Sequence, residues 1–140
     1  MGRTNNPSAV IIDASIWIAL FHITDTLHKQ AVSIMELLEK NKTALILPTF
    51  IIQEVVTVLL YKKQSHLIDI WFDFIDTNNV EILHTDHEML HQTNQVMKVK
   101  KYTPKLSYTD WYLFTLSRDQ HWLVVTLDKQ LDRLVNKGVH

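Results

Sequence analysis

Four carboxylate residues are placed where an α/β protein could use them for chemistry: Asp13, Glu54, Asp110 and Asp128. Three of them fall at the end of an expected strand or the start of an expected helix, and Glu54 could reach the same edge of the sheet from a neighbouring helix. Like charges gathered in this way repel one another unless a cation lies among them. Carboxylate oxygens without His or Cys ligands suit Mg²⁺ or Mn²⁺, which activate water and neutralise phosphate charge. The four residues therefore predict a metal-dependent phosphodiesterase.

Three of these carboxylates also have an ordinary structural interpretation as helix caps. Asp13 stands before an expected helix, where a carboxylate can accept hydrogen bonds from backbone N–H groups. Asp110 comes three residues after Ser107, which is close to the spacing of a capping box. Asp128 follows Thr126 at the end of an expected strand and is again a natural cap. From the residues alone, both interpretations of each position stay open.

Glu54 has no such explanation, because it lies near the middle of its expected helix. Phe50, Ile51 and Val58 share its face, and a carboxylate on an apolar face is costly unless a cation pairs with it. The nearest lysine of the same helix, Lys62, lies two turns away. The sequence therefore predicts that Glu54 meets either a distant cation or a metal ion.

A competing signal is the His-Glu-x-x-His pattern that His87, Glu88 and His91 form on an expected helix. In zinc proteases the two histidines of this pattern bind Zn²⁺ and the glutamate is the general base. The chain has eight histidines, and no further ligand follows at the spacing of the extended motif. We therefore keep a zinc protease as a remote alternative and interpret the segment as the polar face of an amphipathic helix.

Basic and aromatic residues add weaker signals for a nucleic-acid substrate. Four lysines before the Asp110 helix could hold substrate phosphates, or could form a solvated charge run: Lys98, Lys100, Lys101 and Lys105. Four tryptophans could stack on bases, but their helical and strand positions favour the core: Trp17, Trp71, Trp111 and Trp122. Neither group identifies a substrate alone.

The elements that must position these residues follow from the hydrophobic pattern. An unalternating apolar run at 9–12 predicts a strand that is buried on both faces, a second short apolar run lies at 44–47, and further strands are predicted at 80–83 and 122–126. Helical spacing and start signals predict helices at 15–21, 28–40, 49–63, 66–76, 86–99, 107–118 and 128–136, with Pro48 suited to the first turn of the third helix. This alternation predicts a three-layer α/β/α fold around a mainly parallel sheet of four strands.

Composition sets outer limits on the kind of protein. The length of 140 residues predicts one domain, 1–140, and the net charge of −1 gives no strong preference for nucleic acid. The absence of cysteine excludes disulfides and thiolate metal sites, and two glycines are too few for a glycine-rich phosphate loop. Residues 1–8 form a polar leader unlike a signal peptide, and no apolar run suits a membrane span. We therefore expect a cytoplasmic protein without a membrane partner.

Four short segments make the sequence similar to a known family: IIDAS around Asp13, FIIQEV around Glu54, LSYTDW around Asp110 and VVTLDKQL around Asp128. In order and spacing they resemble the PIN-domain nucleases, most closely the small stand-alone VapC-type toxin ribonucleases, over about residues 10–134. The resemblance implies that the four acids bind Mg²⁺ or Mn²⁺ and support hydrolysis of RNA. It also implies that the hydroxyls of Ser15 and Thr126 support the acids from beside them.

The same resemblance implies partners and marks two departures. A toxin of this type would be held in check by a small antitoxin protein and would form a homodimer. A second hypothesis is a PIN-fold RNA- or protein-binding scaffold with little or no catalysis. The retention of all four acids argues against this hypothesis. The departures are the bulky run 111–114, where the family usually has small residues, and the little room left for the fifth strand with which the family's sheet often ends.

Overall fold

The computed structural model describes residues 8–136 of the chain. Within this range the strands are β1 (Ala9–Ile12), β2 (Ala44–Pro48), β3 (Glu81–Leu83) and β4 (Leu123–Val125). The helices are α1 (Ala14–Phe21), α2 (His28–Lys40), α3 (Thr49–Tyr61), α4 (Ser65–Thr77), α5 (His87–Lys100), α6 (Tyr108–Gln120) and α7 (Lys129–Asn136). Each crossover between successive strands contains two helices, as the sequence predicts.

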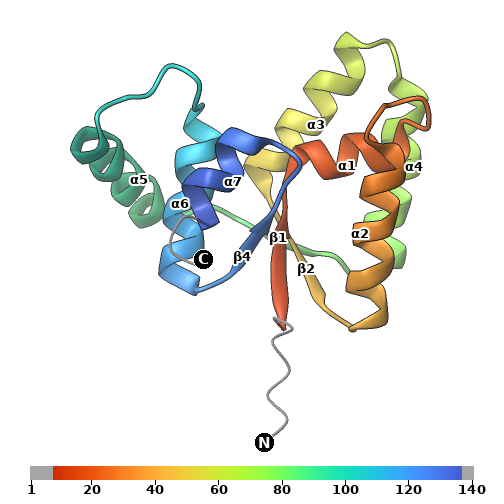
Figure 1. The fold of residues 1–140 in the computed structure, drawn as a ribbon, viewed down its shortest axis with the longest axis horizontal. Helices are drawn as coiled ribbons and strands as arrows, with labels where there is room; N and C mark the ends of the chain where they lie inside the picture. Colours follow the sequence, from red (N-terminus) through yellow and green to blue (C-terminus); the bar gives the residue numbers. More distant parts are fainter. Residues whose placement is uncertain (1–7, 137–140) are drawn as a thin grey trace, which may run out of the picture.

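The four strands form one parallel sheet in the order β3-β2-β1-β4. Strand β1 is central, with Val10 beside Leu45 of β2 on one side and beside Leu123 of β4 on the other. Because all strands run in one direction, their carboxyl ends meet at a single edge, which is at the top of Figure 1. This arrangement confirms the predicted α/β fold, and the described sheet is parallel throughout.

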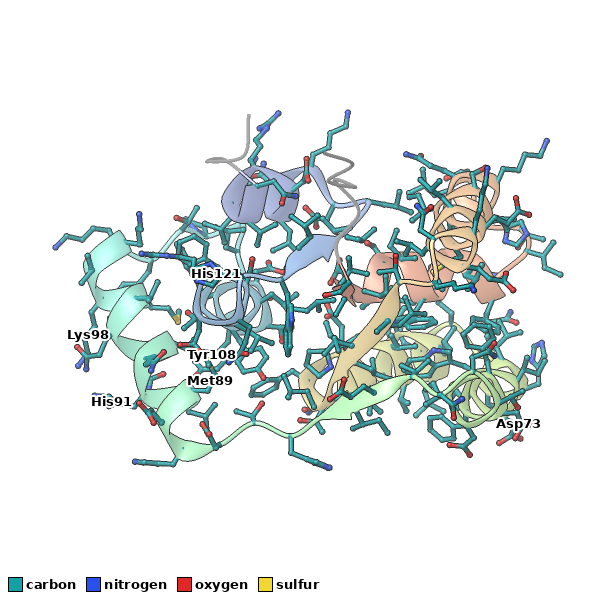
Figure 2. All side chains as sticks on the ribbon, turned by 90° about the horizontal axis from the view of Figure 1, so that it is seen from below. Asp73, Met89, His91, Lys98, Tyr108 and His121 are labelled. Atoms are coloured by element: carbon teal, nitrogen blue, oxygen red, sulfur yellow. The ribbon has the colours of Figure 1, made fainter. Side chains whose placement is uncertain are left out.

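The helices cover the two faces of the sheet as separate layers. Helices α1 to α4 lie on one face and α5 to α7 on the other, which Figures 1 and 2 show from two directions. Trp17 of α1 and Trp71 of α4 pack with ring centroids 5.7 Å apart in the first layer. The bulky run 111–114 is buried in the second, with the Tyr112 ring edge-on to Phe50 at 4.9 Å. The fold therefore accommodates this departure from the family pattern.

Several element ends differ from the sequence prediction by one or two residues. Pro48 is the last residue of β2 and stands immediately before α3, rather than in its first turn. Helix α3 ends at Tyr61 instead of residue 63, because Lys63 has a φ of 58° and cannot continue the helix. Five residues other than glycine adopt a positive φ: Lys42, Lys63, Asn79, Lys101 and His121. The backbone of a residue with a Cβ is strained at positive φ, so these five turns store conformational energy.

None of the helices within residues 8–136 is long and apolar enough to cross a membrane. The polar leader that we expect at 1–8 falls, except for Ser8, outside the described residues. Residues 137–140, to which the expectation about a fifth strand refers, also lie outside them.

Candidate active site

Asp13 lies at the junction of β1 and α1, and its side chain is only 6% exposed. Its Oδ2 atom accepts hydrogen bonds from the hydroxyls of Ser15 at 2.9 Å and Thr126 at 2.8 Å. Asp13 occupies the position before α1, yet its side chain makes no capping hydrogen bond to that helix. The cap interpretation of Asp13 is therefore wrong, and the carboxylate is held by two hydroxyl groups instead.

The two hydroxyls are themselves fixed by the backbone beyond β4. Ser15 Oγ accepts from the N–H of Leu127, and Thr126 Oγ1 accepts from the N–H of Asp128, both at 3.0 Å. A hydroxyl has a single proton, and here each can donate it to Asp13. The hydrogen bonds that Asp13 accepts in the described structure fall on Oδ2, so Oδ1 is available to a ligand. This hydroxyl clamp, formed by Ser15 and Thr126, joins the start of α1 to the end of β4.

Asp110 is oriented by the start of α6. The backbone N–H of Ser107 donates to Asp110 Oδ2 at 2.9 Å, and the N–H of Asp110 donates to Ser107 Oγ at 3.2 Å. This is the capping box that the sequence predicts. Burial raises the pKa of Asp110, the bonds to Ser107 oppose the rise, and the charges of Asp13 and Asp128 add to it. The capping role and a place among the acids are therefore compatible, because the capping bonds use only one oxygen.

Asp128 caps the last helix in the same manner. Its Oδ1 accepts from the N–H groups of Gln130 at 2.8 Å and Leu131 at 3.1 Å. The cap interpretation is confirmed here. The side chain is exposed, and its charge still acts on the other acids through the solvent-facing edge of the sheet.

Glu54 sits on the second turn of α3 and is the most perturbed of the four acids. Burial raises its pKa to about 7, with further increases from the charges of Asp13, Asp110 and Asp128. Protein atoms remove part of its hydration, although the residue as a whole remains exposed. Helix α3 turns other residues inward, namely Ile51, Val55 and Leu59. Every charge that shifts the pKa of Glu54 is negative, which shows that the four carboxylates share one region.

The four carboxylates act on one another electrostatically, but they do not converge on one point. Within residues 8–136, no group of three His, Asp or Glu side chains is close enough to hold a metal ion in the positions shown. An ion that bound here would have to draw the side chains together. The donor chemistry nevertheless fits a hard divalent cation, since all four candidates offer carboxylate oxygens and their mutual repulsion would be relieved.

The histidine motif lies on a different part of the molecule. His87, Glu88 and His91 are exposed on α5, and Gln92 approaches Glu88 with a hydrogen bond of 3.4 Å. In the part of the chain that the structure describes, no further ligand joins the two histidines to complete a metal site. The segment behaves as the polar face of an amphipathic helix, as we expected.

The lysines gather where α5 ends and the loop to α6 begins. All four are exposed: Lys98, Lys100, Lys101 and Lys105. Figure 1 shows this loop on the same side of the molecule as the carboxyl ends of the strands. The Nζ atom of Lys100 lies 5.8 Å from the ring centre of Phe114, so Lys100 is engaged with an aromatic face. Contact of the lysines with phosphates stays a prediction.

Sequence reasoning does not single out Tyr108, which the structure places beside the acids. Its ring meets Phe50 edge-on at 5.9 Å, and its hydroxyl donates to Asn94 Oδ1 at 2.8 Å. Phe50 is one turn before Glu54, so Tyr108 connects α6 with both α3 and α5. The available signal was its position between Ser107 and Asp110.

Comparison with known proteins gives one family and several relatives. The sequence pattern of the PIN domain family matches residues 10–137. A VapC ribonuclease of Archaeoglobus fulgidus is 29% identical over 104 residues, which cover 73% of this chain and 65% of that protein. The match therefore spans slightly less than two thirds of that relative's length.

Two solved structures share the fold at low sequence identity. The VapC20 toxin of Mycobacterium tuberculosis, described as cleaving the sarcin-ricin loop, aligns with a TM-score of 0.73 and 17% identity, over 88% of this chain and 92% of that one. VapBC2 of Rickettsia felis, bound to a DNA fragment from its promoter, aligns with a TM-score of 0.67 and 14% identity, over 91% of this chain and 94% of that one. At these identities the likeness shows the fold alone.

Proposed function

Since this chain belongs to the PIN domain family, we propose that it is a metal-dependent endoribonuclease and the toxin of a toxin–antitoxin pair. The observation that carries the proposal is the gathering of four carboxylates at the carboxyl edge of the sheet, where burial and then the charges of the other three raise the pKa of Glu54. The similarity to a VapC ribonuclease supports RNA as the substrate.

The metal in this proposal is Mg²⁺ or Mn²⁺, held by Asp13, Glu54, Asp110 and Asp128. When bound, the ion would supply an activated water and neutralise charge on the phosphodiester. Its binding would also remove the repulsion among the acids. Hard oxygen donors without His or Cys favour these ions over zinc.

The residues of the chain contribute by holding the carboxylates in fixed orientations. The hydroxyl clamp holds Oδ2 of Asp13, and both of its hydrogen bonds leave Oδ1 for a ligand. Ser107 does the same for Asp110 through the capping box. In both cases one oxygen is held and one is free, which lowers the entropy lost when a ligand binds. The lysines at the end of α5 would attract the RNA backbone.

The test is cleavage of a mixed single-stranded RNA pool in EDTA, Mg²⁺ and Mn²⁺, with the wild type beside Asp110→Asn. The asparagine keeps an oxygen that can accept the Ser107 N–H bond, so the helix start should survive. Asp73→Asn is the matched control, because Asp73 is exposed on α4 at the opposite end of the molecule from α5 (Figure 2). We expect metal-dependent cleavage that Asp110→Asn abolishes and Asp73→Asn retains, with unchanged circular dichroism.

Other outcomes separate the alternatives. Cleavage that persists in Asp110→Asn would contradict the assignment of the centre. A folded wild type that neither binds metal nor cleaves RNA would favour the scaffold hypothesis. Stoichiometric Zn²⁺ that is lost in His87→Ala would favour the protease.

The proposed partners are RNA, a small antitoxin protein and a second copy of the chain. The similarity in fold to VapBC2, which is bound to a DNA fragment from its promoter, supports the antitoxin. Helices α3 and α4 also leave large apolar side chains exposed, as expected of a protein that associates: Leu60, Tyr61, Ile70 and Phe72. Light scattering of the purified chain would test the homodimer, and a monomer at micromolar concentration would contradict it.

A further inference from the structure

A second candidate binding site lies beside the acids, between α5 and the loop that leads to α6. It is a cavity of about 470 Å³, within the size range of small-ligand sites. Its walls carry two tyrosines, two side-chain amides, one imidazole and one ammonium group, from Tyr102, Tyr108, Asn94, Gln95, His91 and Lys98. In Figure 2, Tyr108 lies beside α5, which carries His91 and Lys98. Met97 completes the wall, and most of the lining is apolar, so the cavity offers an apolar surface with a few polar groups at its edge.

The two tyrosines differ in how they meet a ligand. Tyr102 is 66% exposed in the loop, so much of its side chain is accessible to a flat partner. Tyr108 is half-buried and is fixed by its ring contact with Phe50 and its hydroxyl bond to Asn94. An accessible ring next to a fixed one is typical of sites in which unpaired bases stack.

The bond between Tyr108 and Asn94 also determines which group the cavity offers. The hydroxyl proton of Tyr108 is donated to Asn94 Oδ1, so the amide nitrogen of Asn94 keeps its two protons for a ligand. Amide donors of this kind pair with the ring nitrogens and carbonyl oxygens on the edge of a base. The cavity therefore combines a stacking surface with hydrogen-bond donors.

The positive charge around the cavity suits the phosphate of a nucleotide. Lys98 contributes an ammonium group to the wall, and Lys101 and Lys105 lie exposed in the adjoining segment. Lys101 ends α5 with a φ of 61°, a strained conformation for a residue with a Cβ. A phosphate attached to a bound base would meet these ammonium groups.

The cavity is linked to the acids through Tyr108 and Phe50. Tyr108 and Asp110 belong to the same first turn of α6, and Phe50, which touches Tyr108, lies one turn before Glu54. We propose that the cavity binds one unpaired base of the RNA substrate and so positions a neighbouring phosphodiester at the acids. This inference rests on the proposed ribonuclease function and adds to it a site for base recognition.

The experiment measures two quantities with fluorescein-labelled single-stranded RNA of mixed sequence. Binding is followed by anisotropy in the Asp110→Asn background, and cleavage kinetics are followed with Asp110 intact. Tyr102→Ala removes the exposed ring without disturbing the core. Leu37→Ala is the control, because Leu37 is 58% exposed on α2 and belongs neither to the cavity nor to the acids. An oligomer of ribose phosphate without bases serves as the second probe.

We expect Tyr102→Ala to weaken RNA binding and to raise KM by about tenfold, in line with the loss of one stacked base, while kcat stays unchanged. Leu37→Ala should alter neither quantity, and the oligomer without bases should bind the wild type and Tyr102→Ala equally. Cleavage with a KM that Tyr102→Ala does not change would overturn the base site and leave the proposed function intact. An equal loss of affinity for the baseless oligomer would overturn base recognition. A folded wild type that neither binds nor cleaves RNA would overturn both proposals.

Discussion

Replacing Glu54 with glutamine should change how the stability of the protein depends on pH. The folded chain raises the pKa of Glu54 from 4.5 to about 7, through burial and through Asp13, Asp110 and Asp128. Between these two pH values the folded state therefore keeps a proton that the unfolded state has released. The contribution of Glu54 to the free energy of unfolding is therefore greatest below pH 4.5, and this contribution is lost as the pH rises through 7.

The size of the effect follows from the same shift. A rise in pKa from 4.5 to about 7 corresponds to at most about 3 kcal/mol of linked free energy. Because the Glu54 side chain remains exposed, solvent screening reduces this to about 1 kcal/mol. In a domain of this size, about 1 kcal/mol corresponds to roughly 3 °C in Tm. We therefore expect Glu54→Gln to be more stable than the wild type at pH 8 by about that amount.

The assay is thermal and urea unfolding of both proteins from pH 4.5 to 8.5 in EDTA. The difference between the two proteins isolates Glu54, because the histidines and the other acids titrate in both. Glu36→Gln is the matched control, since Glu36 is an exposed residue of α2. Its curve should run parallel to that of the wild type.

Two results would refute the reasoning. If Glu54→Gln and the wild type have parallel pH curves, the folded state does not raise the pKa of Glu54. If the variant is less stable at pH 8, Glu54 has an attractive partner, and the four acids do not form a repulsive group.

Three further predictions concern the same fold. Mg²⁺ at a hundredfold excess over its Kd should stabilise the wild type by about 2.7 kcal/mol in thermal unfolding. Asp13→Asn should not gain this stability from Mg²⁺. Equal gains in the two proteins would contradict a role for Asp13 in metal binding. Thr126→Val removes the hydroxyl bond to the buried carboxylate of Asp13, so urea unfolding should show a loss of about 1–3 kcal/mol. An unchanged midpoint would contradict the clamp. Lys63→Gly should stabilise the protein by about 1 kcal/mol, because glycine adopts the φ of 58° at this position without strain. The control Lys62→Gly, at a φ of −80°, should not stabilise it. Equal effects of the two substitutions would contradict backbone strain at Lys63.

The fold could be predicted from the sequence because its signals are local. Strands β1, β2 and β4 are short apolar runs, and the start of α6 is marked by Ser107 and Asp110, which form the capping bonds that their spacing predicts. The errors lie at the ends of elements, as with Pro48, whose fixed φ suits both the end of a strand and the start of a helix. The left-handed turn at Lys63 was equally hidden, because lysine carries no signal for a positive φ.

The candidate site could be predicted only in part, because its geometry depends on contacts between distant segments. The choice between a cap and a site residue at Asp13 is decided by Thr126, which lies 113 positions further along the chain. The exposure of Glu54 depends on which side of α3 faces the sheet, and several sides of this helix are apolar in sequence. The cavity beside Tyr108 is formed by α5 together with the following loop, and the sequence of neither segment alone indicates a cavity.

The hydroxyl clamp also determines when the site can exist during synthesis. Asp13 leaves the ribosome early, but Thr126, which holds it, is added 113 residues later. At ordinary translation rates of about 5–20 residues per second, this interval lasts roughly 6–20 s. Strand β4, which pairs with β1, also arrives at this late stage. A nascent chain therefore carries Asp13 without its hydrogen bond from Thr126, and β1 without its neighbour β4, until residues 123–126 have been synthesised.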